Sequence, residues 1–254
     1  MTLRVGQIPD LETEPFYVDM MRRGVVLYEM PAHRLAEALE QGEIDAAPVP
    51  LMDCLRLADR LQPVAGFCVA SMQRSGSVFL YTNAPLEDLA GARVGLIEDA
   101  FTASKLLDVL LHQKYKSAPV TYASIEAPPH DALLLVGKPA LLRRGGVRGF
   151  EHTYDLGAEW FTWTGLPFVF ARWMIRPDVE PRDKALLQDT LYVALDDGVD
   201  RLYRLPEPRE DLLMLQRDVM RYIRNYRYFI GLSEEKAMEQ FRAYVEQLPV
   251  PSIP

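Results

Sequence analysis

Apolar and polar residues along the first fifty positions follow a pattern that predicts strands and helices in β-α-β order. Short apolar runs of β type at 3–8, 25–30 and 44–49 are separated by stretches at 15–23 and 31–42 with helical spacing. Strands connected in this way usually lie parallel in one sheet that helices cover. The pattern therefore predicts an α/β fold with mostly parallel sheets flanked by helices.

The alternation stops and then starts again near residue 83. A helix is predicted over 51–61, and 64–70 and 77–82 have the pattern of two consecutive strands. A turn at 83–85 follows, after which the apolar strand 93–97 begins a new β-α-β series. We take the turn as the first hinge between two lobes.

The second half of the chain completes the second series and ends in helices. A helix is expected over 102–115, with strands at 120–125 and 132–136, and the β-type run 166–175 would carry the chain back to the first lobe. The helical C-terminal tail is predicted in three segments, namely 181–204, 208–229 and 233–247. The expected lobes are 1–83 plus 172–254, and 84–171, with a ligand cleft between them, although periodicity alone also fits a single doubly wound domain.

Composition and charge limit the classes of partner. The chain has 254 residues, 49% hydrophobic and 25% charged, as in ordinary globular proteins. A net charge of −8 would repel nucleic acid and anionic lipid. No stretch approaches the roughly 20 apolar residues of a membrane span, and the start does not read as a signal peptide. We expect a cytoplasmic protein with neither partner, although a mature chain without its leader would look the same.

Cysteine and histidine usage gives no indication of a metal site. Cys54 and Cys68 lie in apolar surroundings, which favours buried, inert thiols over a disulfide. The four histidines are scattered without any spacing typical of zinc ligands. We therefore expect no metal.

Four stretches carry a resemblance to a known family. They are RVGQIPDLETEPF (4–16), GEIDAAPVPLMD (42–53), DALLLVGKPAL (131–141) and DLGAEWFTWTGLPFVFARW (155–173). Together they resemble the chorismate dehydratases of the futalosine route to menaquinone, in the same order along the chain. The last stretch is the most specific, because TGLPFVF after DLG and two tryptophans is a long and unusual string.

The resemblance implies a fold and an activity. The fold would be that of type II periplasmic binding proteins, with two lobes closing on a small anionic molecule. The activity would be that of a hydro-lyase, which removes water from chorismate to give 3-[(1-carboxyvinyl)oxy]benzoate without a cofactor. Lobe closure would exclude water from the site.

Several residues in these stretches are candidates for substrate binding. Trp163 and the neighbouring aromatic residues would line a ring-binding cleft, or else form ordinary core. Thr102 is expected as the N-cap of its helix, whose free N–H groups attract a carboxylate. Ser77 and Thr82 lie near the crossing into the second lobe, where they would contact the ligand or remain exposed strand hydroxyls.

The sequence departs from the family pattern at positions expected near the substrate. Glu12 stands where the family has Asn, Lys138 where it has Asp, and Arg172 where it has a small or apolar residue. Two unit charges about 6 Å apart interact by roughly 3 kcal/mol at an effective dielectric of 20. An ionised Glu12 near the substrate would repel chorismate, so either Glu12 points away, or it is protonated, or the substrate is not chorismate. In an enzyme that acts on a related carboxylate or on chorismate, Glu12 would serve as general base.

Two classes of function remain open from the sequence. The first is an enzyme, with Glu12 as its catalytic residue and Ser77, Thr102, Lys138, Trp163 and Arg172 as its substrate-binding residues. Within that class the substrate is chorismate or a related carboxylate, and the enzyme that acts on cyclic dehypoxanthine futalosine fits less well. The second is a binding protein without catalysis. A homodimer through Met20, Met21 and the C-terminal helices is also possible.

Overall fold

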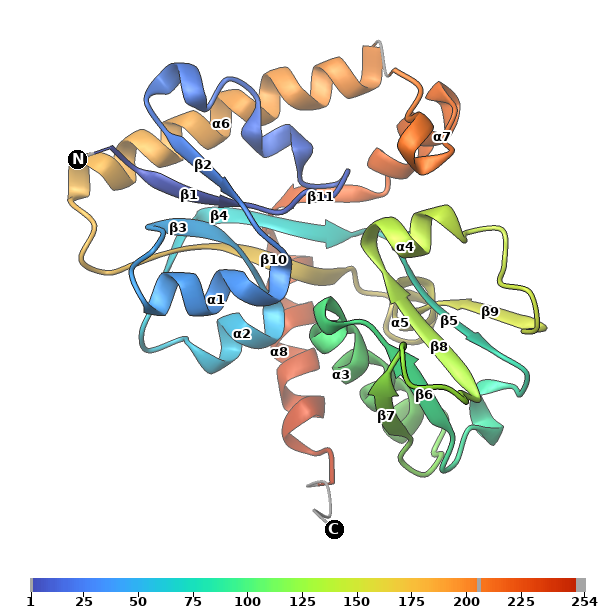
Figure 1. Ribbon diagram of the computed structural model, residues 1–254. Helices are drawn as coiled ribbons and strands as arrows, with labels where there is room; N and C mark the ends of the chain where they lie inside the picture. Colours follow the sequence, from blue (N-terminus) through green and yellow to red (C-terminus); the bar gives the residue numbers. More distant parts are fainter. Residues whose placement is uncertain (1, 205–206, 250–254) are drawn as a thin grey trace. The chain divides into compact units, whose positions relative to one another are not determined.

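The computed structural model describes residues 2–204 and 207–249 (Figure 1), and they form two compact units. The first unit holds the chain up to Met72 together with Val169–Gly231. The second holds Gln73–Phe168 and the chain from Leu232 onward. Both units are therefore discontinuous in sequence.

The first unit is built on a six-stranded mixed sheet. Its strands are β1 (Arg4–Gln7), β2 (Val26–Glu29), β3 (Ala46–Pro50), β4 (Gln62–Ser71), β10 (Phe168–Ile175) and β11 (Tyr226–Phe229), in the order β11-β4-β10-β3-β1-β2. Strand β1 is parallel to β2 and β3, whereas β10 is antiparallel to β3 and β11 is antiparallel to β4.

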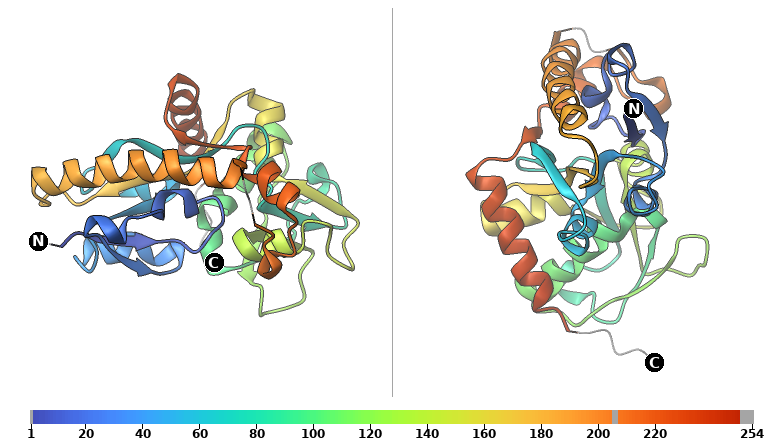
Figure 2. Two further views of the ribbon diagram at one scale, coloured as in Figure 1. Left: turned by 90° about the horizontal axis from the view of Figure 1, so that it is seen from above. Right: turned by 90° about the vertical axis from the view of Figure 1, so that its left-hand side faces the viewer.

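Helices pack against both faces of this sheet. They are the 3₁₀ turns η1 (Glu14–Tyr17), η2 (Met21–Arg23) and η6 (Glu210–Leu212), and the α-helices α1 (Ala32–Glu40), α2 (Leu51–Arg56), α6 (Pro181–Arg204) and α7 (Gln216–Ile223). Helix α6 runs along the sheet (Figure 2) and contacts β4 and η1. Helix α1 buries Leu35 and Leu39 in a core shared with β3 and β10.

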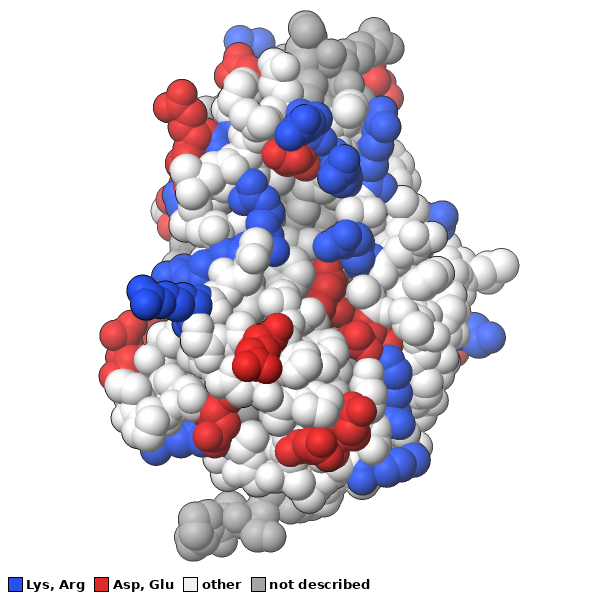
Figure 3. Space-filling view, turned by 90° about the vertical axis from the view of Figure 1, so that its right-hand side faces the viewer, with Lys and Arg blue, Asp and Glu red and all other residues white. Residues whose placement is uncertain are grey.

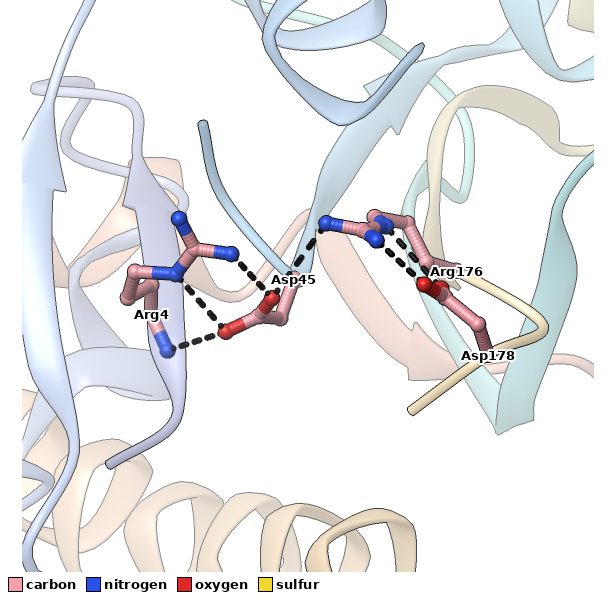
Figure 4. A network of polar contacts seen from close by, with 4 residues as sticks. All are labelled: Arg4, Asp45, Arg176 and Asp178. Atoms are coloured by element: carbon pink, nitrogen blue, oxygen red, sulfur yellow. Dashed lines mark hydrogen bonds and ion pairs between the residues drawn. The ribbon is translucent and has the colours of Figure 1, made fainter. Parts of the chain in front are cut away.

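An ion-pair network at one end of the sheet joins distant parts of the chain (Figure 4). Asp45, just before β3, accepts hydrogen bonds from the backbone and guanidinium of Arg4, with the closest nitrogen at 2.6 Å. Arg176, just after β10, lies 3.7 Å from Asp45 and also pairs with Asp178. The network fixes β1, β3 and β10 beside one another.

The second unit is built on a five-stranded mixed sheet. Its strands are β5 (Val78–Thr82), β6 (Arg93–Leu96), β7 (Thr121–Ser124), β8 (Ala132–Val136) and β9 (His152–Asp155), in the order β7-β6-β8-β5-β9. Strand β6 is parallel to β7 and β8, and β5 is antiparallel to β8 and β9. Its helical elements are η3 (Leu86–Asp88), η4 (Glu98–Ala100), α3 (Phe101–Val109), the π-helical η5 (Leu110–Lys114), α4 (Gly137–Leu142), α5 (Leu156–Thr164) and α8 (Leu232–Glu246).

An aromatic cluster attaches α8 to the second unit. Trp160 of α5 and Phe168 both make edge-to-face contacts with Phe241 of α8, at ring-centroid distances of 6.0 and 5.0 Å. All three rings are buried. The C-terminal helix therefore belongs to this unit, whereas the sequence pattern placed it with the first.

The structure corrects several expectations from the sequence. The sheets are mixed rather than mostly parallel. The stretch 208–229, expected as one helix, contains η6, α7 and β11, and β9, α4 and α5 were not predicted. Strand β5 pairs within the second sheet, so the turn at 83–85 lies inside the second unit instead of at its edge.

The burial of the two methionines and the two cysteines tests what the sequence predicted for them. Met20 is fully buried, so only Met21 is available to a partner surface. Cys54 and Cys68 are buried and are not joined in a disulfide, as the sequence predicted. No described helix is both long enough and apolar enough to cross a bilayer.

Helix α6 approaches η1 so closely that Gly198 has no room for a side chain. A Cβ atom at this position would lie 2.7 Å from the Pro15 carbonyl oxygen and 2.8 Å from its Cα. Both contacts are with backbone atoms, which cannot move away by a change of rotamer as a side chain can. The close approach fixes the chain segment that follows β1.

We predict that Gly198→Ala destabilises the protein, although Ala favours a helix by about 1 kcal/mol over Gly. Forcing the two backbones apart should lower the free energy of unfolding by about 1–3 kcal/mol. Urea unfolding followed by circular dichroism measures this. Gly145→Ala is the control, because nothing lies within 4 Å of its Cβ position. A Gly198→Ala protein more stable than wild type would contradict the close packing.

Candidate functional site

The candidate site residues of the first unit lie at one edge of its sheet. Strands β1 and β3 are parallel, so their carboxyl ends meet at the same edge. Strand β10 is antiparallel to β3 and begins there, with Ala171 beside Pro50 and Arg172 beside Val49. Ligands of open α/β sheets bind outside the carboxyl ends of the strands.

The segment after β1 is held by hydrogen bonds that position Glu12. The Thr13 hydroxyl donates to the Ile8 carbonyl oxygen at 2.8 Å, and the Ile8 N–H donates to the Tyr17 hydroxyl at 3.1 Å. Burial raises the pKa of the Tyr17 phenol, so it stays neutral. The turn is thus fixed from both sides by buried polar groups.

Glu12 points into the first unit, not into bulk solvent. The residue is 9% exposed, and the Tyr222 hydroxyl donates to its Oε2 at 2.7 Å. The hydroxyls of Tyr222 and Tyr226 are 3.2 Å apart. The Tyr222 hydrogen bond therefore gives the carboxylate a defined orientation. Glu12 is not an exposed surface residue of the first unit.

Sequence reasoning missed the two tyrosines because it read 208–229 as one helix. Tyr222 lies on the buried face of α7, and Tyr226 is the first residue of β11, whose residues alternate between buried and exposed. That alternation at 226–229 is a strand signal of period two.

Arg172 lies on the face of β10 that carries α1 and α2. The Cys54 thiol donates to the Val49 carbonyl oxygen at 3.2 Å and lies 4.0 Å from the Arg172 carbonyl oxygen. Burial raises the pKa of the Cys54 thiol to about 12, although the backbone and charge of Arg172 act in the opposite direction. Arg172 itself is half-buried.

In the second unit, three predicted residues meet at the carboxyl edge of β6 and β8. Ser77 is buried, and its carbonyl oxygen accepts a hydrogen bond from the Gly137 N–H at 2.9 Å. Lys138 follows in the first turn of α4 and is exposed. Thr102 lies in the first turn of α3, after β6.

The predicted capping role of Thr102 is wrong. The N-cap of α3 is Ala100, and Thr102 is already inside the helix, where its backbone is helical. The 3₁₀ turn η4 runs directly into α3, so the helix starts earlier than the hydroxyl residue suggested. Thr102 is 7% exposed and stays at the strand edge without the predicted function as a cap.

Asp155 organises this edge and was not among the predicted site residues. As N-cap of α5 it accepts a hydrogen bond from the Ala158 N–H at 3.0 Å. The same carboxylate accepts from the N–H and hydroxyl of Ser75, each at 2.9 Å, and from the Gly76 N–H at 2.7 Å. It therefore fixes the loop that leads into Ser77. The acidic DLG of the fourth resembling stretch was the available signal.

Trp163 lies away from this edge. It is in the last turn of α5, eight residues and about 12 Å along the helix from Asp155. Its ring stacks on Tyr244 of α8 with centroids 5.0 Å apart and packs against Trp160. The aromatic residues Trp160 and Phe168 are core, as the plainer interpretation of the sequence held.

The structure thus collects Ser77, Thr102 and Lys138 at one edge of the second sheet, and Glu12 and Arg172 at one edge of the first. That the two edges share a cleft stays a prediction. A separate groove of about 880 Å³ in the first unit runs between α6 and β11 and is lined by none of the predicted residues. Figure 3 shows acidic and basic side chains interspersed on the face it draws.

Comparison with known sequences identifies relatives over nearly the whole chain. The profile of a family described as menaquinone biosynthesis matches residues 3–247. A chorismate dehydratase from Thermus thermophilus is 30% identical over 249 residues, covering 90% of this chain and 88% of that protein.

Solved structures show the fold. A protein from Archaeoglobus fulgidus has a TM-score of 0.76 at 15% identity, with 96% of each chain covered. The alkanesulfonate-binding protein SsuA from Xanthomonas axonopodis pv. citri has a TM-score of 0.61 at 14% identity, over 98% of this chain and 94% of that one. A Candida albicans protein with the generic periplasmic binding protein fold scores 0.60 at 10% identity, over 100% and 92%. The type II periplasmic-binding-protein-like fold is therefore confirmed.

We predict that Asp155→Asn loosens the loop before Ser77. An amide has only one accepting oxygen, so it leaves part of the Ser75, Gly76 and Ala158 set without an acceptor. The free energy of unfolding should fall by about 1–3 kcal/mol. Amide hydrogen exchange at Ser75 and Gly76 should also accelerate. Asp189→Asn, an exposed change of equal charge, is the control. Equal exchange in wild type and both variants would contradict the anchoring role.

Proposed function

Because the chain belongs to the menaquinone biosynthesis family, we propose that it is a hydro-lyase that converts chorismate to 3-[(1-carboxyvinyl)oxy]benzoate. The observation that carries the proposal is the identity to a chorismate dehydratase over nearly the whole chain. The retained scaffold and the buried acidic group after β1 support it. The cytoplasmic location and the homodimer expected from the sequence stay predictions.

The reaction needs proton transfer and positioning, which side chains supply. A base removes the proton from the ring carbon that carries the enol ether, and the hydroxyl on the neighbouring carbon leaves. The proton and the hydroxide combine as water, and the ring becomes aromatic. The stability of that ring favours the products, so the protein's main tasks are to orient the ring and to hold a base.

Glu12 is our candidate for the base. Its carboxylate is nearly buried, and the hydrogen bond from Tyr222 to Oε2 sets its direction. A positioned general base typically contributes a factor of about 10²–10⁴ to the rate. Ser77, Thr102 and Lys138 form the polar edge of the second unit, where Lys138 would attract a carboxylate of the substrate.

The direct test is incubation of the purified protein with chorismate. Mass spectrometry should show a product lighter by one water, at a rate that scales with protein concentration. Calorimetric binding of chorismate without any product would indicate a binding protein without catalysis. Neither binding nor product, with prephenate bound instead, would indicate a related carboxylate as substrate.

We predict that Glu12→Asn and Glu12→Gln lower turnover of chorismate by roughly 100-fold or more, as expected for a lost base. Binding should be unchanged or tighter, by up to about a hundredfold, because a negative charge near an anionic substrate is removed. Steady-state kinetics and calorimetry measure the two effects. Glu43→Gln is the control, since Glu43 is exposed. Tighter binding with undiminished turnover would show that Glu12 contacts the substrate without acting as base.

A further inference from the structure

Arg172 differs from other half-buried arginines of the first unit. Arg4 pairs with Asp45, Arg176 with Asp45 and Asp178, and Arg209 with Glu14. The Arg172 guanidinium makes no ion pair or hydrogen bond with any residue that the structure describes, and its Nε is buried without a partner. This holds in a chain with 36 acidic residues.

A half-buried charged group without a partner lowers the stability of the folded protein. Burying a donor without an acceptor destabilises the folded state, and a charged donor does so more strongly. The neighbouring Cys54 thiol is itself buried and neutral, so it offers no anion. Groups that lower stability in the free protein are expected where a ligand supplies the missing partner.

The place of Arg172 agrees with that expectation. It stands beside Val49, next to the last residue of β3, at the edge where β1 leads to Glu12. A guanidinium presents two parallel N–H groups that match the two oxygens of a carboxylate. Because no hydrogen bond to a described residue holds the guanidinium in place, the Arg172 side chain can turn toward a ligand at this edge.

We infer that Arg172 is the anchor for a carboxylate group of a small ring acid bound at the carboxyl edge of the first sheet. The identity of that acid as chorismate rests on the proposed function, whereas the anchor itself does not.

The anchor is tested with two probes of the same shape, benzoate and the neutral benzamide. Arg172→Met should weaken benzoate binding by about ten- to a hundredfold and change benzamide binding by less than about twofold. Arg172→Lys, which keeps the charge and loses the two-pronged contact, should fall between. Arg182→Met is the matched control, because it removes an exposed arginine from the first turn of α6. Titration by ligand-observed NMR measures the affinity of each of the four proteins for both probes.

Stability and kinetics separate the possible outcomes. Without ligand, the melting temperature of Arg172→Met should be unchanged or higher, because the lost charge had no partner. With chorismate, its KM should rise by a similar factor while kcat stays within about twofold, as for uniform binding. Benzoate binding that is equal in wild type and Arg172→Met, or absent from wild type, overturns the anchor. If benzoate binding depends on Arg172 but the protein does not convert chorismate, the proposed function is wrong and the anchor stands.

Discussion

The pairing of Asp45 with Arg4 and Arg176 is the interaction on which the first unit depends (Figure 4). It joins the start of the chain to a strand that returns after more than a hundred residues, and so it sets the register of β10 against β3. A slip by one residue would exchange the faces of Arg172 and Trp173. The indole would then leave its packing on Phe16, and the arginine would enter that apolar core. The geometry at the carboxyl edge is thus determined at the opposite end of the same strands.

Much of the architecture follows from local patterns. The β-α-β periodicity of the first fifty residues and the apolar runs of β6 and β8 identified most strands, and the family motifs indicated the fold. The remainder depends on tertiary partners. Four residues at 226–229 form a strand only because β4 presents an open edge, and a run of aromatic residues at 160–168 is compatible with either helix or strand until α8 covers it.

The candidate site was less predictable than the fold, for reasons that differ between residues. Glu12 and Arg172 were visible as departures from a motif, but their burial and partners were not. Thr102 looked like a cap because hydroxyl residues often are, yet the preceding 3₁₀ turn starts the helix earlier. Asp155 was hidden in a motif whose acidic residue anchors the loop at 74–76. Hydrogen-bond partners distant in sequence leave no periodic signature.

The attachment of α8 to the second unit has a consequence for how the protein is made. The chain passes between the units after Met72, after Phe168 and again after Gly231. A ribosome delivers residues from the amino terminus, so the strands of the second sheet emerge well before the helix that covers Trp160 and Phe168. That apolar surface stays open until α8 has been made. The core of the second unit is therefore completed only when α8 covers the rings that α5 and the start of β10 leave open.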